Sequence, residues 1–497
     1  MTAGKKAFVV ASLGILGLAY ILYIPLPDQL TDLPRLQIFE PILRLVYHYP
    51  AKLASRINDQ WHLLWLRMSL HFLVRLAALV DCVEADVLTT DVEFDGVPVR
   101  VYEPKRRHSD GALIFFHGGG FVLFNVDSYD ALTRDLAVET GMLTVSVNYR
   151  VAPEHLFPAA VEDCERAVVH FLRSAHKDFK ADANKVVLIG DSAGGNLVAV
   201  ATQRLKRFDD LPPVKLQVLI YPFMQLLDFK TPSYCDAAQL YRGTMFVDPE
   251  SIARLMLTYL GLTLDHVPLL LNNSHAAHLR ATRSSFYQRI NHERLPELFR
   301  RSCAPELPLY DQAATVGYFL KSVEPFLFDP NFAPLFVDDL SALPPALVIT
   351  SEFDILRDEG FWYADRLHEQ GVAVSWWHLK SGFHGMFNIH RVISLARSTV
   401  GRIGRFVLRH LSLCLDVYTL WSTDKVTSSR LLGVPSGTAA CESTLTSRPL
   451  QELLQRNIEA AVAVVMQQDL LPYLLQNSDC AATLTIETPW PPCSVAP

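Results

Sequence analysis

Between residues 112 and 410, short apolar runs rich in β-branched residues alternate with segments of helical periodicity. Short, continuous apolar runs are typical of parallel strands that are buried on both faces. Helical segments between such strands predict a mostly parallel, doubly wound α/β sheet. The expected strands are residues 113–116, 143–148, 186–189, 216–221, 346–350 and 373–379, and the expected helices are residues 129–140, 159–174, 196–207 and 359–370.

Two features frame this alternating region. Upstream, segments 86–94 and 97–102 are separated by Asp95-Gly96, which favours a tight hairpin and predicts that the sheet begins with antiparallel strands. Between Tyr221 and Pro345 the alternation is interrupted by helical segments and scattered prolines. An insertion at the carboxyl edge of a parallel sheet lies over the ligand crevice, so a helical lid is expected there. A separate small domain without a role at the site is the alternative.

The motif Gly-Asp-Ser-Ala-Gly at residues 190–194 places Ser192 between an expected strand and an expected helix. A turn of this kind presents a nucleophile clear of its own backbone, and small neighbouring residues avoid clashes in the bend. The start of the following helix favours developing negative charge. Ser192 is therefore the candidate nucleophile, and Asp191 beside it is expected to be a structural hydrogen-bonding carboxylate.

A second motif, His-Gly-Gly-Gly at residues 117–120, follows another expected strand. Consecutive glycines let backbone amides approach a ligand without side-chain interference. Together with the amide of Ala193, this loop is expected to form an oxyanion hole, in which each donor contributes about 3–4 kcal/mol. A plain flexible loop is the alternative, but it explains less well why the motif precedes the serine turn.

A serine nucleophile needs a base, and the base needs an acid that orients it. In an α/β-hydrolase arrangement these follow the serine in the order acid, then histidine. His384 lies between glycines after the strand expected at 373–379, and Asp354 follows the strand expected at 346–350. Glu352 and Asp358 compete for the role of acid, although Asp358 suits the start of a helix.

Three blocks in this order resemble the hormone-sensitive-lipase branch of the α/β-hydrolases: residues 117–120, 149–155 and 190–196. The uncharged anchor described below, the lid lengths and residues 354–358 make residues 1–412 most similar to arylacetamide deacetylases and their paralogues. Phe121 and Val122 depart from relatives that have tryptophan and cysteine there, which concerns substrate preference and one disulfide. The resemblance implies a catalytic triad of Ser192, Asp354 and His384, and an oxyanion hole of His117, Gly118, Gly119 and Ala193.

The N-terminal residues indicate where the chain lies in the cell. Lys5 and Lys6 precede an uncharged apolar run over residues 7–24, and acidic residues follow it. At about 1.5 Å per residue, this run nearly crosses a bilayer core of about 30 Å. The charge bias favours a cytoplasmic N-terminus, residues 1–6, and a lumenal remainder. A cleaved signal peptide is the alternative.

The expected organisation is therefore a transmembrane signal-anchor at 7–24, followed by a lumenal hydrolase domain over 25–412 with lid segments at about 30–85 and 223–340. Within the first lid segment, residues 61–80 are apolar but contain histidines and arginines, which predicts an amphipathic helix that packs on the protein or touches the membrane surface. Residues 413–497, rich in Ser, Thr, Gly and Pro, are expected to be a divergent and poorly ordered tail.

Composition excludes several other classes. The formal net charge of -7, from 45 basic and 52 acidic residues, gives no support for nucleic-acid binding. None of the eight cysteines belongs to a motif with zinc-ligand spacing. The serine-hydrolase reaction expected here uses neither a metal nor an organic cofactor. Asn272 begins an N-glycosylation sequon, which matters only if that segment is lumenal and exposed.

The sequence thus predicts a membrane-anchored serine hydrolase that cleaves carboxylic esters, arylamides or acyl lipids. Members of the resembled family are anchored in the endoplasmic reticulum with lumenal catalytic domains and act on lipophilic substrates, so the expected partners are a lipophilic small molecule and the membrane. A catalytically weak or inactive interaction protein on the same fold is the competing hypothesis, because a fold does not fix a function. A peptidase is a third, and no clamp for a peptide terminus is evident.

Overall fold

The computed structural model describes residues 23–55, 59–79, 86–241, 244, 246–276, 279, 284–300 and 313–412. The membrane helix expected over residues 7–24 lies almost entirely outside these residues, and so does the tail expected over 413–497. Within the described ranges, no helix is long and apolar enough to cross a membrane.

An eight-stranded sheet forms the centre of the fold, in the order β1-β2-β4-β3-β5-β6-β7-β8. The hairpin of β1 and β2 is antiparallel and β2 also pairs with β4 in antiparallel fashion, whereas the remaining neighbours are parallel. This confirms the mostly parallel sheet and its antiparallel start. The strands are β1 (Val87–Phe94), β2 (Val97–Pro104), β3 (Ala112–Phe116), β4 (Leu143–Val147), β5 (Val186–Asp191), β6 (Leu216–Ile220), β7 (Ala346–Phe353) and β8 (Val374–Phe383).

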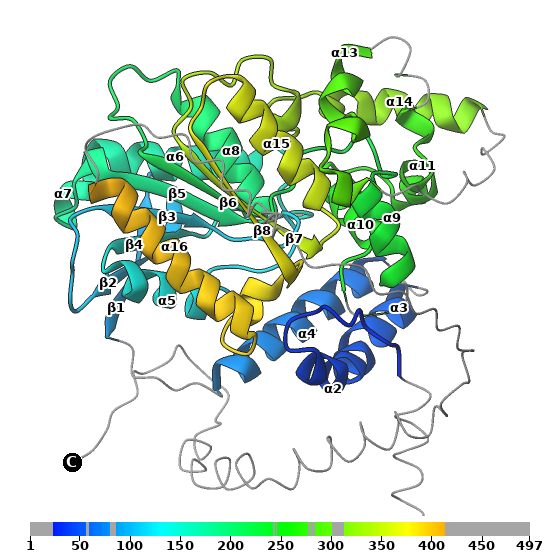
Figure 1. The fold of residues 1–497 in the computed structure, drawn as a ribbon, viewed down its shortest axis with the longest axis horizontal. Coiled ribbons are helices and arrows are strands. Elements are labelled where there is room, and N and C mark those ends of the chain that lie inside the picture. The colour runs from blue at the N-terminus through cyan, green and yellow to red at the C-terminus, as the bar shows by residue number, and fades with distance from the viewer. Residues whose placement is uncertain are drawn as a thin grey trace, which may run out of the picture. The chain divides into compact units, whose positions relative to one another are not determined.

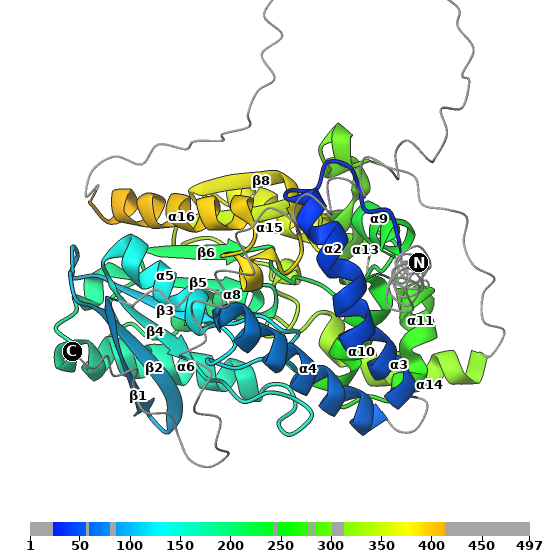
Figure 2. The ribbon, with the colours of Figure 1, turned by 90° about the horizontal axis from the view of Figure 1, so that it is seen from below.

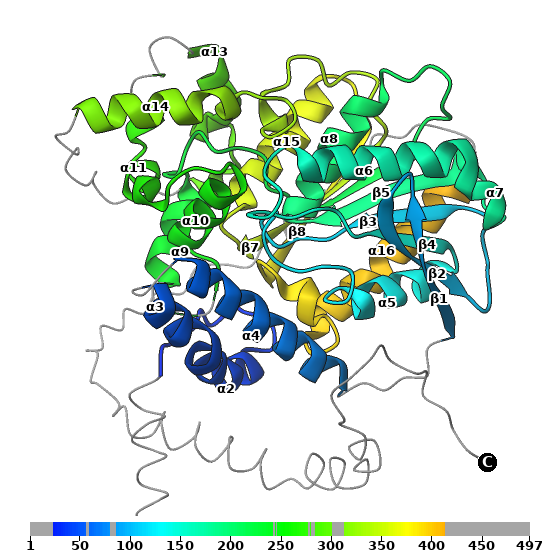
Figure 3. The ribbon, with the colours of Figure 1, turned by 180° about the vertical axis from the view of Figure 1, so that it is seen from behind.

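Helices cover both faces of this sheet (Figures 1 and 3). Every residue of β3, β4, β5 and β6 is buried, as expected for strands between two helical layers. One face is covered by α5 (Asp130–Thr140) and α16 (Ser394–Ser412), which contact each other, and the opposite face by α6 (Ala159–His170) and α8 (Ala193–Leu205). The helix α15 (Arg357–Glu369) packs on β7, and short turns η2 (Phe171–Ala175), α7 (His176–Asp178), η3 (Ala183–Lys185) and η9 (Met386–Ile389) complete this body.

Two further groups of helices lie together at one end of the sheet (Figure 2). The first group precedes the sheet and contains α2 (Leu33–Leu43), η1 (Arg44–His48), α3 (Tyr49–Ser55) and α4 (Asp59–Leu79), so the helix expected over 61–80 is present. The second group lies between β6 and β7 and is built of short pieces. These are α9 (Pro232–Leu240), α10 (Pro249–Tyr259), η4 (Leu264–His266), α11 (Val267–Leu271), α13 (Ser284–Tyr287), η5 (Gln288–Ile290), η6 (His292–Arg294), η7 (Glu297–Phe299), α14 (Ala313–Leu327) and η8 (Pro334–Phe336).

Candidate active site

Ser192 lies in a strained turn between β5 and α8. Its backbone has φ 55° and ψ -119°, a conformation that residues other than glycine rarely adopt. Neighbouring glycines permit the turn: a Cβ on Gly190 would lie 2.4 Å from the carbonyl oxygen of Gly194, and a Cβ on Gly194 would lie 2.0 Å from that of Phe116. The sequence therefore folds here into a sharp bend that holds the Ser192 side chain, which is 8% exposed, beside the ring of His384.

A continuous chain of hydrogen bonds joins Ser192, His384 and Asp354. The Ser192 Oγ lies 3.0 Å from Nε2 of His384, while Nδ1 of His384 lies 2.9 Å and 3.0 Å from the two carboxylate oxygens of Asp354. Asp354 directly follows β7 and His384 directly follows β8, as the sequence predicts for the carboxyl ends of parallel strands. In this geometry His384 can take a proton from the serine while Asp354 holds the ring.

The two competing acids have other partners. The carboxylate of Glu352 lies 2.9 Å from Nε2 of His378. Asp358 accepts hydrogen bonds from the side chain of Arg357 and from the amide of Ser233. Asp354 is thus the acid that the fold brings to His384.

Asp191 connects the serine turn to the glycine loop. One carboxylate oxygen accepts the amide hydrogen of Gly118 at 2.9 Å, and the other accepts the hydroxyl hydrogen of Tyr129 at 2.9 Å. Burial raises the pKa of Asp191 to about 6, against the opposing effects of the Tyr129 hydroxyl, the charge of His384 and the Gly118 amide. The expectation of a structural carboxylate at Asp191 agrees with these contacts. In this structure the amide hydrogen of Gly118, one of the expected oxyanion donors, is bonded to Asp191.

Gly119 and Gly120 adopt backbone conformations that residues with a side chain rarely adopt. Gly119 has φ +110° and Gly120 has φ +62°, and a Cβ on Gly119 would lie 2.5 Å from the carbonyl oxygen of Leu123. Within the described residues, the amides of Gly119, Gly120 and Ala193 donate none of the observed hydrogen bonds. These three amides are therefore available to a ligand. Gly120 was not among the expected donors, although the run of three glycines was the signal that could have identified it.

His117 is the first residue of the glycine loop, and its ring is bonded to the backbone of that loop. Its ring is fully buried, stacks on Tyr149 with ring centroids 4.1 Å apart, and its Nδ1 lies 2.8 Å from the carbonyl oxygen of Gly118. The Tyr149 hydroxyl donates to the backbone oxygen of His117 at 2.6 Å. Burial lowers the pKa of His117 to about 4, so the ring is neutral near pH 7. His117 consequently supports the loop and contributes no charge to the site.

Both groups of end helices contact the loops of the site. The guanidinium of Arg67 on α4 donates to the carbonyl oxygen of Val122, just after the glycine run, at 2.8 Å and 2.9 Å. On α10, the side chain of Leu255 lies where a Cβ on Gly120 would come within 2.7 Å of it. Both α4 and α10 therefore contact the same loop.

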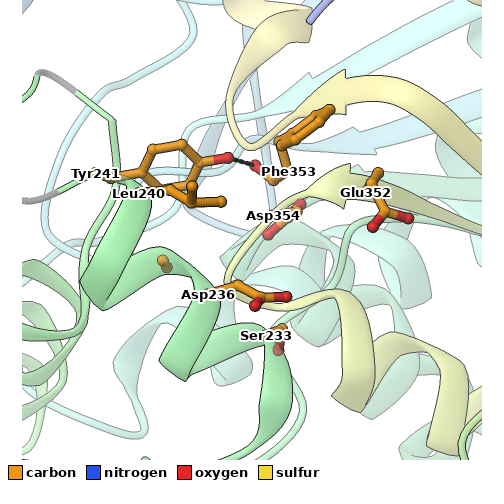
Figure 4. Close-up of a pocket in the computed structure, with 8 residues that line it drawn as sticks. Ser233, Asp236, Leu240, Tyr241, Glu352, Phe353 and Asp354 are labelled. Carbon is orange, nitrogen blue, oxygen red and sulfur yellow. Dashed lines mark hydrogen bonds between the residues drawn. The ribbon is translucent and has the colours of Figure 1, made fainter. Parts of the chain in front are cut away.

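The helix α9 lies beside the strand end that precedes Asp354 (Figure 4). The hydroxyl of Tyr241 donates to the carbonyl oxygen of Phe353 at 2.9 Å. Around this contact is a cavity of about 10 Å³ that is lined by Ser233, Asp236, Leu240 and Asp354, among others. Such a volume suffices for about one water molecule and is too small for a substrate.

Three further features named from the sequence are a metal site, the cysteines and the glycosylation sequon. No group of side chains that could hold a metal ion occurs within the described residues. Cys164 is a free, buried cysteine, whereas Cys235 on α9 is disulfide-bonded. Asn272 follows α11 and is half-buried, so its glycosylation stays a prediction.

A family model described as the alpha/beta hydrolase fold matches residues 113–286 and 308–388. The chain is 33% identical over 381 residues to neutral cholesterol ester hydrolase 1 of Rattus norvegicus, with coverage of 74% of this chain and 89% of that protein. It is 33% identical over 400 residues to arylacetamide deacetylase of Oryctolagus cuniculus, with coverage of 77% and 94%.

Among solved structures, a hyperthermophilic esterase from the archaeon Pyrobaculum calidifontis superimposes with a TM-score of 0.51 at 27% identity, covering 78% of this chain and 99% of that one. The resemblance inferred from the motifs is thereby confirmed. This chain belongs to the α/β-hydrolase fold family, among relatives that include arylacetamide deacetylase and neutral cholesterol ester hydrolase 1.

Proposed function

We propose that this protein is a carboxylic ester hydrolase that forms an acyl-enzyme on Ser192. The observation that supports this most is the hydrogen-bond chain from the Ser192 hydroxyl through His384 to Asp354. The esterases, deacetylase and cholesterol ester hydrolase among its relatives support the same reaction class.

In the proposed reaction, the Ser192 Oγ attacks the acyl carbonyl carbon while Nε2 of His384 takes the hydroxyl proton. The tetrahedral intermediate then collapses, and the departing alcohol receives that proton from His384. Water next attacks the acyl-enzyme and gives its proton to His384, which returns one to Ser192 as the acid leaves. Asp354 keeps the ring oriented and stabilises its positive charge throughout.

The negative charge on the intermediate needs donors. We assign this role to the amides of Gly119, Gly120 and Ala193, since Gly118 is engaged by Asp191. Two of them lie in a loop whose conformation only glycine accommodates well, and Ala193 begins a helix of 13 residues. Each such donor contributes about 3–4 kcal/mol to stabilisation of the transition state.

The proposed substrates are lipophilic esters, arylamides or acyl lipids. Apolar rings surround the glycine loop: Phe121 stacks on Tyr259 with centroids 4.2 Å apart and meets Phe223 edge-on. The helices on either side of that loop, α4 and the helices between β6 and β7, would act as a lid. Lining of this kind favours apolar acyl groups, since each buried CH₂ contributes about 0.8 kcal/mol.

For location, we propose a single-pass anchor at residues 7–24 with the catalytic domain in the lumen of the endoplasmic reticulum. The uncharged run of that segment supports the anchor. The disulfide at Cys235 supports an oxidising compartment, because such bonds are rare in the cytosol.

A substrate panel tests the proposed function. The full chain, purified in detergent, is assayed on esters of increasing acyl length, on arylamides and on triacylglycerols, beside a Ser192→Ala variant. We expect hydrolysis that depends on Ser192 and rises in kcat/KM with acyl length. Absence of any Ser192-dependent hydrolysis across the panel would favour the non-catalytic alternative instead.

A further inference from the structure

Exposed apolar side chains gather on the N-terminal helices. Among the large hydrophobic side chains that are exposed in the described residues, most belong to the first fifty or so described positions. A soluble surface usually scatters such side chains singly, and a concentration of them marks an interaction site. They are Tyr23, Ile38, Phe39, Ile42, Leu45, Val46, Tyr49, Leu53, Leu64, Trp65, Met68 and Phe72, here called the N-terminal apolar face.

Their spacing shows that they form two helical stripes. On α2, η1 and α3, the exposed positions 38, 42, 45, 49 and 53 recur every three or four residues, as one side of a helix does. On α4, Leu64, Met68 and Phe72 are four residues apart, and the last two are each 60% exposed. The opposite side of α4 contributes Leu66 to the core. The helix α4 thus carries apolar side chains both on its buried side and on the side that faces outward.

A hydrogen bond joins the two stripes into one surface. The indole Nε1 of Trp65 on α4 donates to the carbonyl oxygen of Val46 in η1 at 3.1 Å, and α3 packs against α4. Figure 2 shows α2, α3 and α4 together along one side of the molecule.

The charges on these helices favour an anionic or zwitterionic lipid surface. Glu40 is the only carboxylate in residues 33–55, and it is buried in an ion pair with Arg44 at 3.0 Å. Arg35 and Lys52 are exposed on the same segment. Tyrosine and tryptophan within an apolar face, with basic side chains beside it, are typical of helices that lie in a membrane interface.

We propose that the N-terminal apolar face lies on a lipid bilayer. The chain that precedes it supports this occupant over a protein partner: residues 7–24 are uncharged and apolar, and Tyr23 of the face is part of that run. The run ends at residue 24, within ten residues of the start of α2 at Leu33. A bilayer that contains the run would therefore lie next to the face.

Residues beside the face are bonded to two segments next to the candidate site, the end of β8 and the glycine loop. The amide of Thr31 donates to the carbonyl oxygen of Ser381, three residues before His384, at 3.0 Å. From α4, Arg67 holds Val122 beside the glycine loop. A docked face would therefore hold both segments near the bilayer, where lipophilic substrates are concentrated. This last consequence rests on the proposed function, whereas the docking itself does not.

Photochemical cross-linking tests the docking without requiring catalysis. The full chain is reconstituted into vesicles of phosphatidylcholine and phosphatidylserine that contain a phosphatidylcholine with a diazirine on its acyl chain. After irradiation, we expect lipid adducts on peptides that contain Met68 and Phe72. Peptides with Leu88 and Leu298, which are equally exposed at 62% and 60% but lie elsewhere, should carry about tenfold fewer adducts. Equal labelling of the two sets, or none on the face, would overturn the proposal and point to residues 413–497 or a second copy as its cover.

A pair of double variants tests the consequence for substrates. The variant Met68→Gln/Phe72→Gln should lower kcat/KM about tenfold for a long-chain ester dissolved in the vesicles and leave a short, water-soluble ester unchanged. The matched control Leu88→Gln/Leu298→Gln should change neither value. An equal effect of the two double variants would contradict the coupling. If the wild-type chain hydrolysed neither ester, the proposed function would fail while the cross-linking result stood.

Discussion

The carboxylate of Asp191 accepts the amide hydrogen of Gly118 at 2.9 Å, and this bond fixes the glycine loop to the turn that carries Ser192. The donors of the proposed oxyanion hole come from both of these segments, so this bond contributes to the distance between them, beside the pairing of β3 with β5. Tyr129 supports it with a second hydrogen bond. Asp191 thus helps to position the donors of the proposed oxyanion hole without being one of them.

The buried position of Asp191 predicts a pH-dependent stability. Burial raises its pKa from 3.8 to about 6, so the folded chain holds this proton to higher pH than the unfolded chain does. The stability from this group is complete below pH 3.8 and is lost as the pH rises through about 6. An asparagine at this position does not titrate, so the unfolding free energy of wild type relative to Asp191→Asn should fall by about 2 kcal/mol between pH 4 and pH 7.

Thermal or denaturant unfolding at several pH values measures this difference. A wild-type advantage over Asp191→Asn that grows with pH would contradict the burial argument.

Asp354 should be the acid on which turnover depends. The variant Asp354→Asn is expected to bind substrate normally but to lose about 10⁴-fold in kcat, because His384 would adopt the wrong tautomer. Its neighbour Glu352 provides the matched control: it binds His378, so Glu352→Gln should keep kcat within a few-fold of wild type. Steady-state kinetics on one ester decide the matter, and a crippling effect of Glu352→Gln would show that the acid is misassigned.

Arg67 should hold the glycine loop in place. Its guanidinium donates to backbone oxygens of Val122 and Ala152, so Arg67→Met leaves these acceptors without their charged donor. We expect a loss of about 2–3 kcal/mol in unfolding free energy together with a lower kcat. Arg173→Met removes a pair with Asp210 in which both side chains are half exposed, and should cost less than about 1 kcal/mol. Equal losses in the two variants, from denaturant titration, would remove the special role of Arg67.

Several of these relationships were accessible from the sequence and others were not. The strands around Ser192, Asp354 and His384 were predicted because continuous apolar runs and their order specify a parallel sheet. Two strands end later than predicted. β7 continues beyond residue 350 to Phe353, and β8 beyond residue 379 to Phe383, because pairing between them extends through polar residues and an irregular register. The local sequence contains no record of that pairing.

The assignment of the oxyanion donors shows the same limit. Three consecutive glycines predict a loop of exposed amides. They do not show that the amide of Gly118 is bonded to Asp191, which lies 73 positions away in the chain. Arg67 looked like an isolated charge in an apolar segment, and its partners Val122 and Glu154 are similarly distant in the chain. Such contacts are tertiary, so residue type and spacing alone do not specify them.

The proposed membrane topology predicts which side of the membrane the catalytic domain occupies. In intact microsomes, protease should leave the chain after Ile24 undigested until detergent is added. A shift in mobility on glycosidase treatment, absent in Asn272→Gln, would independently place residue 272 in the lumen. Digestion of the catalytic domain without detergent would contradict the proposed orientation.

The central claim concerns the nucleophile, and covalent labelling tests it most directly. The Ser192 Oγ lies 3.0 Å from Nε2 of His384, which can take its proton, so a fluorophosphonate should phosphonylate it. Mass spectrometry of the labelled full chain should find the adduct on the peptide with Ser192. The Ser192→Ala variant should neither label nor hydrolyse esters, whereas Ser174→Ala at an exposed serine should do both normally. Labelling at another residue, or undiminished turnover by Ser192→Ala, would contradict the account.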